Sequence, residues 1–339
     1  MINSQKYKIL NSVNEIDVNQ WDDLAKQSDV ATWFQTNIAY KFYASLPRIM
    51  IPFVCALQVE RDLKGVVVGY ITKESNAIKQ LLTRRAIIVG GPLLANDITN
   101  YEVELLMTAT KKSLKGKTIY IETRNFNDYS ACRDGFIASE FEYVPHLNFH
   151  VNTTSKEIIE DNLSKSRKRD IRVSFRDGVT VINKPSIEQV RSYYTILADL
   201  YQTKVKLPLF PLEFFERLYE LESSRFLLVE YNGEIFGGTV CVCQQDKTMF
   251  EWFVCGKDGL VKNIFPSEVA TYAGLLCSVD DNCAKFDMMG AGSPNVKYGV
   301  RDFKAKFGGQ LVEYGRYLCV LNKLSYSLGK LGVKLLKKR

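Results

Sequence analysis

Hydrophobic and polar positions change their period several times along the chain, which predicts a mixture of helices and strands. In residues 15–45, Trp21, Leu24 and Ala25 recur at helical spacing. The rest of the first half reads as a helix at 100–113 and strands at 51–58, 66–71, 86–89, 118–123 and 147–152.

The pattern restarts after about residue 150. Helices are predicted at 155–175, 187–201, 211–221 and 266–277, and strands at 180–183, 225–231, 237–243, 249–254, 284–288 and 311–321. Asn232-Gly233 lies between two of these strands and is a strong hairpin signal. Neither half alternates strand and helix strictly, so the fold class expected is α+β, with mainly antiparallel mixed sheets flanked by helices.

A length of 339 residues suggests two domains and a tail, expected at 1–150, 151–322 and 323–339. Hydrophobic residues make up 46% and charged residues 24%, which predicts a folded core. No run approaches the roughly 18 to 20 apolar residues of a membrane span, and the N-terminus lacks the apolar stretch of a signal peptide. We therefore expect a cytoplasmic protein. Most of the eight cysteines, among them Cys55, Cys241, Cys243 and Cys319, fit as small core residues with free thiols.

The net charge of +7 is concentrated rather than spread over the surface. Residues 323–339 carry six basic residues and no acid, so the rest of the chain has a net charge of about +1. A second group is Lys165, Arg167, Lys168, Arg169 and Arg172. This distribution argues against a general DNA- or RNA-binding surface and favours one anionic ligand and one anionic surface.

The tail predicts an amphipathic helix. Leu324, Leu328, Leu331 and Leu335 fall on one face, with Lys323, Lys330, Lys334 and Lys337 to one side. Such a helix is suited to the anionic face of a membrane, which would make the protein peripheral on the inner face. The alternative is a frayed basic terminus.

Residues 286–309 are the most informative stretch. A short apolar strand runs into a loop containing Gly290, Ala291 and Gly292, and a helical segment with Phe303 and Lys304 follows. Glycine-rich strand-to-helix junctions often hold ligands in α/β proteins. The alternative is a surface loop followed by a glycine-capped helix, with Phe303 in the core and Lys304 exposed.

The basic cluster is the second candidate. On a helix, Lys165, Arg169 and Arg172 share about one face, and arginine forks suit phosphate or carboxylate. The alternative is a solvated face.

Other chemistries find little support. His146 and His150 lie in a strand-like run, where about 13 Å would separate them, so no metal site is expected. With two histidines, neither in a nucleophile motif, no Ser-His-Asp or Cys-His set is indicated. Asp287 and Glu251 are the two candidates for a general base.

Several motifs together resemble the FemAB-type transferases. Phe286-Asp287, Gly290-Ala291, Gly299-Val300, Phe303-Lys304 and Phe307-Gly308-Gly309 are similar to the closing motif of that family. Ser166–Arg172 with Gly178-Val179 resembles its basic segment, Arg85–Pro92 its "GGP" turn, and Phe34-Gln35-Thr36 its N-terminal element. Together these motifs span roughly residues 15–320, and their shared order is more specific than any one of them.

The resemblance implies two tandem GNAT-like domains and an acyltransferase. In that reading Lys304 and Phe303 serve the acyl transfer, and Arg169 and Arg172 hold substrate phosphates. Tyr201 and Lys204 resemble a further substrate-contacting segment, with Lys204 where the family often has arginine. Gly290, Ala291 and Gly292 would line the substrate site.

The acyl donor stays open between aminoacyl-tRNA and acyl-coenzyme A, and no bound cofactor is expected. No good copy of the coenzyme A loop Q/R-x-x-G-x-G/A is present, but neither is the long helical insertion that some relatives carry to reach tRNA. The first hypothesis is transfer of an acyl or aminoacyl group to an amine of a phosphate-bearing cell-envelope precursor, such as a peptidoglycan precursor or a lipid- or nucleotide-linked amino sugar. The second is an acetyl-coenzyme A-dependent N-acetyltransferase acting on a small amine, and the third is a non-catalytic member that binds a precursor or the membrane.

Overall fold

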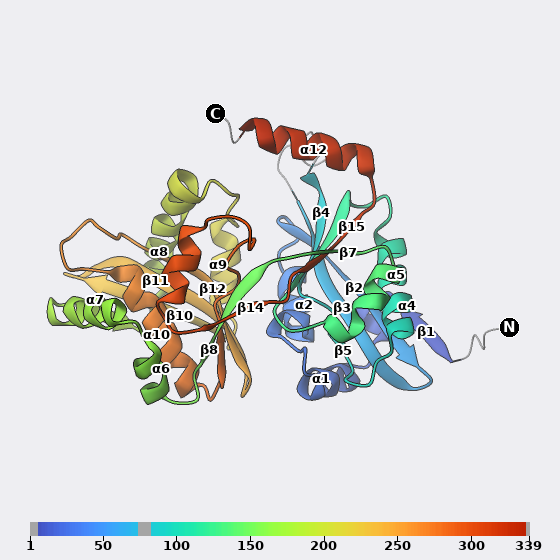
Figure 1. Ribbon diagram of the computed structural model, residues 1–339, viewed down its shortest axis with the longest axis horizontal. Helices are drawn as coiled ribbons and strands as arrows, with labels where there is room; N and C mark the ends of the chain where they lie inside the picture. The colour runs from blue at the N-terminus through green and yellow to red at the C-terminus, as the bar shows by residue number, and fades with distance from the viewer. Residues whose placement is uncertain (1–5, 74–82, 337–339) are drawn as a thin grey trace. The chain divides into compact units, whose positions relative to one another are not determined.

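The computed structural model describes residues 6–73 and 83–336. The chain forms two compact units (Figure 1). The first unit comprises Met1–Pro145 and Tyr314–Arg339, and the second comprises His146–Glu313.

The first unit is built on a mainly antiparallel sheet. Its strands follow the order β1-β2-β3-β4-β6-β15-β7, and β5 pairs with β3. The strands are β1 (Tyr7–Leu10), β2 (Met50–Val59), β3 (Asp62–Thr72), β4 (Arg85–Gly90), β5 (Leu93–Leu94), β6 (Tyr120–Asn125), β7 (Glu142–Val144) and β15 (Arg316–Val320). Among the described strand pairs of this sheet, only β4 and β6 run parallel.

Helices cover both faces of this sheet. They are α1 (Val18–Gln27), α2 (Asn37–Ala44), α4 (Asn100–Leu114) and α5 (Arg133–Ala138), and a further helix, α12 (Lys323–Leu336), follows β15. Side chains alternate between the two faces of a strand. Val67 of β3 accordingly shares a core cluster with Leu106 of α4, whereas Tyr70 of the same strand contacts Tyr43 of α2 on the opposite face, with ring centroids 5.1 Å apart.

The second unit repeats this plan. Its strands follow the order β14-β8-β13-β12-β11-β10-β9, and only β12 and β13 run parallel among the described pairs. The strands are β8 (Leu147–Asn152), β9 (Thr180–Ile182), β10 (Ser224–Tyr231), β11 (Glu234–Gln244), β12 (Thr248–Gly256), β13 (Lys285–Asp287) and β14 (Gln310–Glu313).

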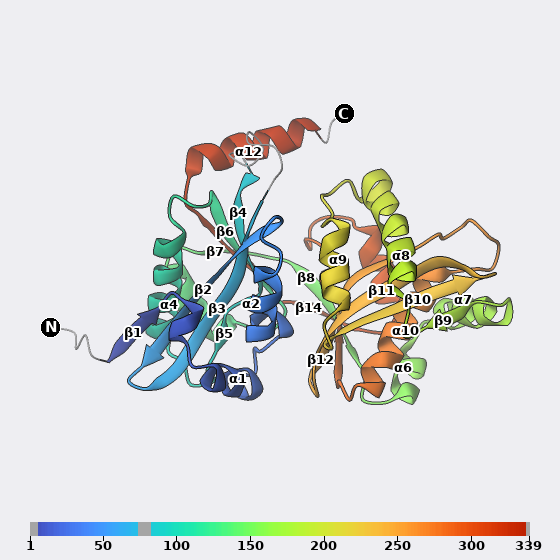
Figure 2. The ribbon, with the colours of Figure 1, turned by 180° about the vertical axis from the view of Figure 1, so that it is seen from behind.

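Helices again lie on the two faces of the sheet (Figures 1 and 2). They are α6 (Lys156–Asn162), α7 (Lys165–Arg176), α8 (Ile187–Leu200), α9 (Leu212–Tyr219), α10 (Pro266–Asp280) and α11 (Gly299–Ala305), with a π-helical turn at Tyr201–Val205. Phe286 of β13 joins the cluster that includes Leu275 of α10. Phe215 of α9 packs on Phe253 of β12 at 4.9 Å, on the other face.

The two units exchange one strand each. β8 follows β7 in the chain but pairs with β13 and β14, while β15 follows β14 but pairs with β6 and β7. Burial explains the exchange, since Phe149 of β8 belongs to the core of the second unit and Tyr317 of β15 to the core of the first. The units therefore differ from the expected division at 1–150 and 151–322, because residues 314–322 lie with the first unit and 146–150 with the second.

The α+β class with two mainly antiparallel sheets is confirmed, and several local expectations need correction. Residues 15–45 contain two helices separated by a turn, and residues 155–175 are split into α6 and α7 at Leu163-Ser164. The expected strand 311–321 is two strands, because Gly315 adopts a φ of +63° between them. Cys55, Cys241, Cys243 and Cys319 are buried free thiols, as expected.

Candidate active site

The pairing between two parallel strands of the second unit ends partway along the longer strand. The unpaired edge of β12 beyond that point is called the opening below. β12 and β13 pair only as far as Phe250 and Asp287. The chain then leaves the sheet after Asp287, whereas β12 continues to Gly256 without a strand partner on that side among the described residues. Trp252 is an extra residue in β12, because Val240 faces Phe253 and Cys241 faces Glu251 across the ladder. Such a bulge re-aims neighbouring side chains, and the unpaired strand edge can accept an extended ligand.

Lys304 lies at this opening. Its side chain is buried, with the residue 7% exposed. Its Nζ donates to the carbonyl oxygen of Gly290 at 2.7 Å and to that of Met288. The turn presents both carbonyls to one point because Met289 and Gly290 have φ values of +53° and +100°. The alternative of an exposed Lys304 is therefore wrong.

A hydrogen-bonded clamp fixes the turn. Asp287 Oδ1 accepts from the Met289 amide and from Asn148 Nδ2, each at 2.7 Å. Asn148 Oδ1 accepts from the Gly290 amide at 2.7 Å. His150 Nε2 lies 3.0 Å from Asp287 Oδ2. The carbonyls that hold Lys304 are thus positioned by side chains of β8 and β13.

The charges around Lys304 are themselves buried. Burial lowers the pKa of Lys304, and the nearby carboxylates of Glu251 and Asp287 oppose that shift. Burial likewise raises the pKa of Glu251, against the opposing influence of Lys304. Glu251 Oε1 accepts from Thr239 Oγ1 at 3.3 Å, and Oε2 has no hydrogen-bond partner among the described residues. A buried acid with a raised pKa beside a buried amine is an arrangement typical of proton transfer.

Phe303 precedes Lys304 on α11 and fixes that helix to α7. The guanidinium of Arg167 lies 4.6 Å from the ring centroids of both Phe303 and Phe307. It also donates to the Phe303 carbonyl at 3.3 Å and pairs with Glu268 of α10. Arg167 is therefore a positioning residue for α11. The sequence did not single it out, although Ile171 and Ser174, one and two turns later on the same helix face, mark that face as buried.

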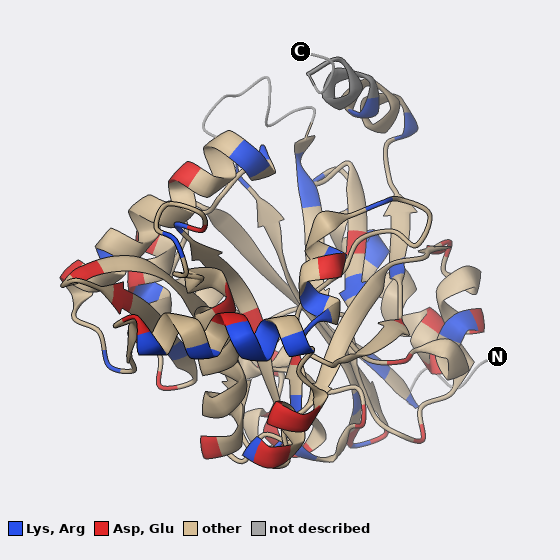
Figure 3. Ribbon diagram, turned by 60° about the vertical axis from the view of Figure 1, so that its left-hand side comes forward, with Lys and Arg blue, Asp and Glu red and all other residues tan. Residues whose placement is uncertain are grey.

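Arg169 and Arg172 face solvent instead. Both are exposed, and Arg169 pairs with Asp170 at 2.8 Å. At 100° per residue, each points away from the Arg167 face. They belong to a row of Lys and Arg along α7 (Figure 3). The structure therefore does not bring them to the Lys304 cluster.

The other residues that the sequence predicts at the substrate site are partly or fully buried, except Lys204, which is exposed. Tyr201 is half-buried in the π-helical turn, and its pKa is raised by burial, with a further contribution from the nearby Tyr298. Gly292 packs against Tyr298, since a Cβ at Gly292 would lie 2.9 Å from that ring. Ala291 is buried, and its carbonyl accepts from Arg301 Nε at 2.9 Å. Lys204, three residues after Tyr201, is exposed.

The N-terminus of α10, next to the end of β12, already holds acidic groups. Asp258 accepts from the Ser267 amide at 3.1 Å and from the Ser267 hydroxyl. Glu268 in the first turn pairs with Arg167. A helix N-terminus attracts anions, so here carboxylates have taken the place that a phosphate would need.

Among the residues of the first unit that the structure describes, there is no comparable opening. Its parallel strands β4 and β6 pair through to Gly90 and Asn125. Gln35 Nε2 donates to the carbonyls of Gly90 and Gly91 at 3.1 and 2.9 Å, and Tyr129 OH donates to the Gly90 carbonyl at 2.9 Å. The Gly-Gly-Pro turn is therefore closed by side chains.

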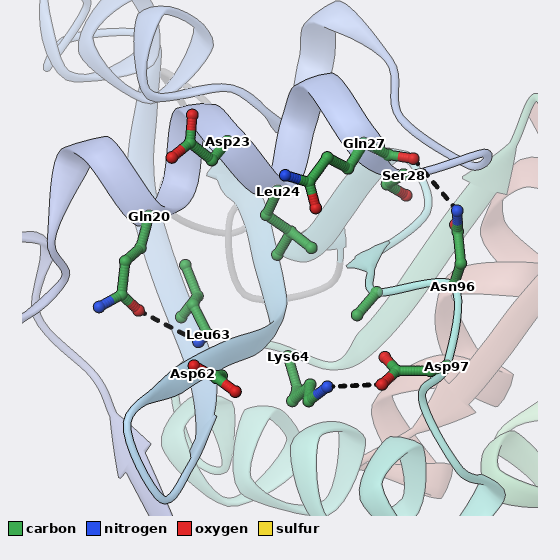
Figure 4. Close-up of a pocket in the computed structure, with 11 residues that line it drawn as sticks. Gln20, Asp23, Leu24, Gln27, Ser28, Asp62, Leu63, Lys64, Asn96 and Asp97 are labelled. Carbon is green, nitrogen blue, oxygen red and sulfur yellow. Dashed lines mark hydrogen bonds and ion pairs between the residues drawn. The ribbon is translucent and has the colours of Figure 1, made fainter.

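A hollow of about 520 Å³ does lie in the first unit, between α1 and the β3 and β5 region (Figure 4). Asp23, Asp62 and Asp97 line it, and Lys64 Nζ pairs with Asp97 at 2.7 Å. It contains none of the predicted site residues. Among residues 6–73 and 83–336, no group of three His, Cys, Asp or Glu side chains is placed to hold a metal.

The arrangement of the strands is shared with known structures. No protein-family model matches this sequence, and neither does any curated protein. The crystal structure of FemX matches with a TM-score of 0.71 and 11% identity, over 95% of this chain and 99% of that chain. The C-terminal domain of a putative lysylphosphatidylglycerol synthetase from Agrobacterium fabrum matches with a TM-score of 0.59 and 12% identity, over 95% and 96%. A tandem GNAT protein from the clavulanic acid biosynthesis pathway matches with a TM-score of 0.57 and 8% identity, over 94% and 99%.

These similarities define the fold. The chain shares its fold with FemX and with a tandem GNAT protein, which confirms the fold implied by the sequence resemblance. Within the described residues, no helix combines the length and the apolar character that crossing a membrane requires.

Proposed function

We propose that this protein is a FemAB-like transferase that moves an acyl or aminoacyl group onto an amine of a cell-envelope precursor. The observation that carries the proposal is the buried Lys304 at the opening between β12 and β13, held by the carbonyls of Met288 and Gly290. The similarity of the fold to FemX and to the lysylphosphatidylglycerol synthetase domain supports it.

The chemistry follows from the residues at the opening. The acceptor amine attacks the carbonyl carbon of the donor ester, a C–N bond forms, and negative charge develops on the carbonyl oxygen. An ammonium has three N–H groups, and Lys304 uses two on the turn, so the third is available for that oxygen. Glu251 takes the proton from the amine. The C–O bond then breaks, and Glu251 returns this proton to the leaving oxygen, which departs as a hydroxyl. Phe303 holds α11, and hence Lys304, in place.

The donor we propose is an aminoacyl-tRNA ester rather than acyl-coenzyme A. A coenzyme A diphosphate would meet the carboxylates of Asp258 and Glu268 at the α10 N-terminus, where like charges repel. The corresponding helix of the first unit, α4, is capped by Thr99 and Glu102. Neither helix therefore offers an unoccupied N-terminus for phosphate.

The acceptor side is proposed from the remaining residues. Arg169 and Arg172 would contact phosphates from the exposed face of α7. Tyr201, Lys204, Gly290, Ala291 and Gly292 would line the approach to Lys304. The precursor would be met on the cytoplasmic side of the membrane, where phosphate-bearing precursors carry free amines.

Donor binding is the experiment that tests the proposal. Purified protein is titrated separately with acetyl-coenzyme A and with charged aminoacyl-tRNA. Saturable tRNA binding that weakens with salt, without a coenzyme A signal, is the expected result. Tight coenzyme A binding would instead favour an N-acetyltransferase acting on a small amine. Binding of neither donor, with no transfer to any amine-bearing precursor, would favour a non-catalytic precursor-binding protein.

A further inference from the structure

The last described helix has one side fixed to the first unit and one side left open. α12 starts after Asn322, whose side chain accepts from the Ser325 amide at 3.0 Å. Tyr326 packs edge-on against Tyr120 of β6, with ring centroids 5.2 Å apart. The helix is therefore attached through its first turns, and Figures 1 and 2 show it as a separate rod at the end of the first unit.

The open side carries leucines beside lysines. Leu324 and Leu328 are 81% and 58% exposed, and a spacing of four places them on one helix face. Lys323 and Lys330 are also exposed. The sequence beyond Lys330 adds Lys334, Lys337, Lys338 and Arg339 without any acid.

We infer that α12 binds the surface of an anionic lipid bilayer. Leucines on one face can enter the boundary between headgroups and acyl chains, while lysines at the side reach anionic headgroups. A nucleic acid would satisfy the lysines and leave the leucines in water. A second copy of the chain would satisfy the leucines but would bring two strongly basic tails together. A bilayer with negative headgroups is the partner that accommodates both kinds of residue.

The test is co-sedimentation of the full chain with vesicles of phosphatidylcholine, alone or mixed with phosphatidylglycerol. Binding is expected only to the mixed vesicles, and it should weaken with added salt. Leu324→Glu with Leu328→Glu should lower the partition coefficient at least about tenfold, and Lys323→Glu with Lys330→Glu should do likewise.

Matched control variants show whether the loss of vesicle binding is specific to α12 or follows from any added charge at an exposed position. Leu207→Glu and Leu260→Glu alter leucines that are 57% and 66% exposed in the second unit, so they should leave partitioning unchanged. Lys115→Glu and Lys117→Glu, exposed in the first unit outside α12, control for net charge. Equal vesicle binding by the leucine variant and the unaltered chain would overturn the inference. So would a dimer, seen by sedimentation, that the leucine variant abolishes while vesicles bind neither form.

Discussion

The Nζ of Lys304 donates a 2.7 Å hydrogen bond to the carbonyl oxygen of Gly290, which lies fourteen residues earlier in the chain. It also donates to the carbonyl oxygen of Met288, the residue that directly follows β13. This contact joins α11 to the turn that follows β13. It also places a buried amine where β12 has lost its neighbouring strand.

Replacement of Lys304 by alanine should abolish most transfer. We expect kcat to fall by about 10²–10³, since the donor to the developing oxyanion is lost. The two carbonyls would lose their partner, which should lower the free energy of unfolding by about 1–3 kcal/mol. Single-turnover transfer and chemical unfolding measure the two effects. Lys306→Ala, at an exposed position on the same segment, is the matched control. Unchanged turnover in Lys304→Ala would remove Lys304 from the mechanism.

Glu251 should give the protein a characteristic pH dependence. Burial raises its pKa, so the folded state holds a proton more tightly than the unfolded chain does. The stability that this proton provides is present below the ordinary glutamate pKa, about 4.3, and is lost as pH rises through the raised pKa. Glu251→Gln should remove that decline from unfolding curves measured across pH.

The same substitution tests catalysis. If Glu251 takes the proton from the amine, the rate for the unaltered chain rises with pH as Glu251 ionises, and Glu251→Gln should be slow at every pH. Glu234→Gln, an exposed change on the neighbouring strand β11, should alter neither profile. A fast Glu251→Gln enzyme would mean that positioning and desolvation alone activate the amine.

The α+β class and most elements could be predicted because apolar runs bounded by turn residues mark buried strands, as in β10 and β11, which are buried over continuous runs on either side of the Asn232-Gly233 turn. The exchange of β8 and β15 between the units could not be predicted, because the pairing of a strand depends on residues that are far away in the sequence. The clamp of Asn148 on Asp287 spans 139 positions for the same reason.

The position of Arg167 on its helix explains why its role was not predicted from the sequence. The spacing of Lys165, Arg169 and Arg172 correctly indicates a shared face, but that face is exposed. A guanidinium can be buried when it has an acid and aromatic rings as neighbours. Arg167 has both, in Glu268 and the rings of Phe303 and Phe307, and these lie more than a hundred residues away.

Arg167→Ala should therefore destabilise the second unit far more than a change on the exposed face. We expect a loss of about 3 kcal/mol in the free energy of unfolding, at the lower end of the range for a buried pair, because the half-buried Glu268 is left without its partner. Arg169→Ala should change it by less than about 0.5 kcal/mol. The double variant Arg167→Ala with Glu268→Gln should lose less free energy of unfolding than the two single variants lose in total. Strict additivity in that cycle would show that the ion pair contributes nothing.

Gly290→Ala tests whether the backbone conformation of the turn sets the position of Lys304. Space is not the obstacle, since a Cβ at Gly290 would meet only His146, at 3.5 Å. The obstacle is the φ of +100°, which an L-residue adopts at a cost of about 1–2 kcal/mol. The variant should be destabilised by that amount and should also lose turnover, because the carbonyl that binds Lys304 would be displaced. Gly299→Ala provides the control, because no atom lies within 4 Å of its Cβ position and it begins α11. Alanine favours a helix over glycine there, so that variant should be as stable as the unaltered chain or more so. A Gly290→Ala protein with full stability and full turnover would mean that the turn does not set the position of Lys304.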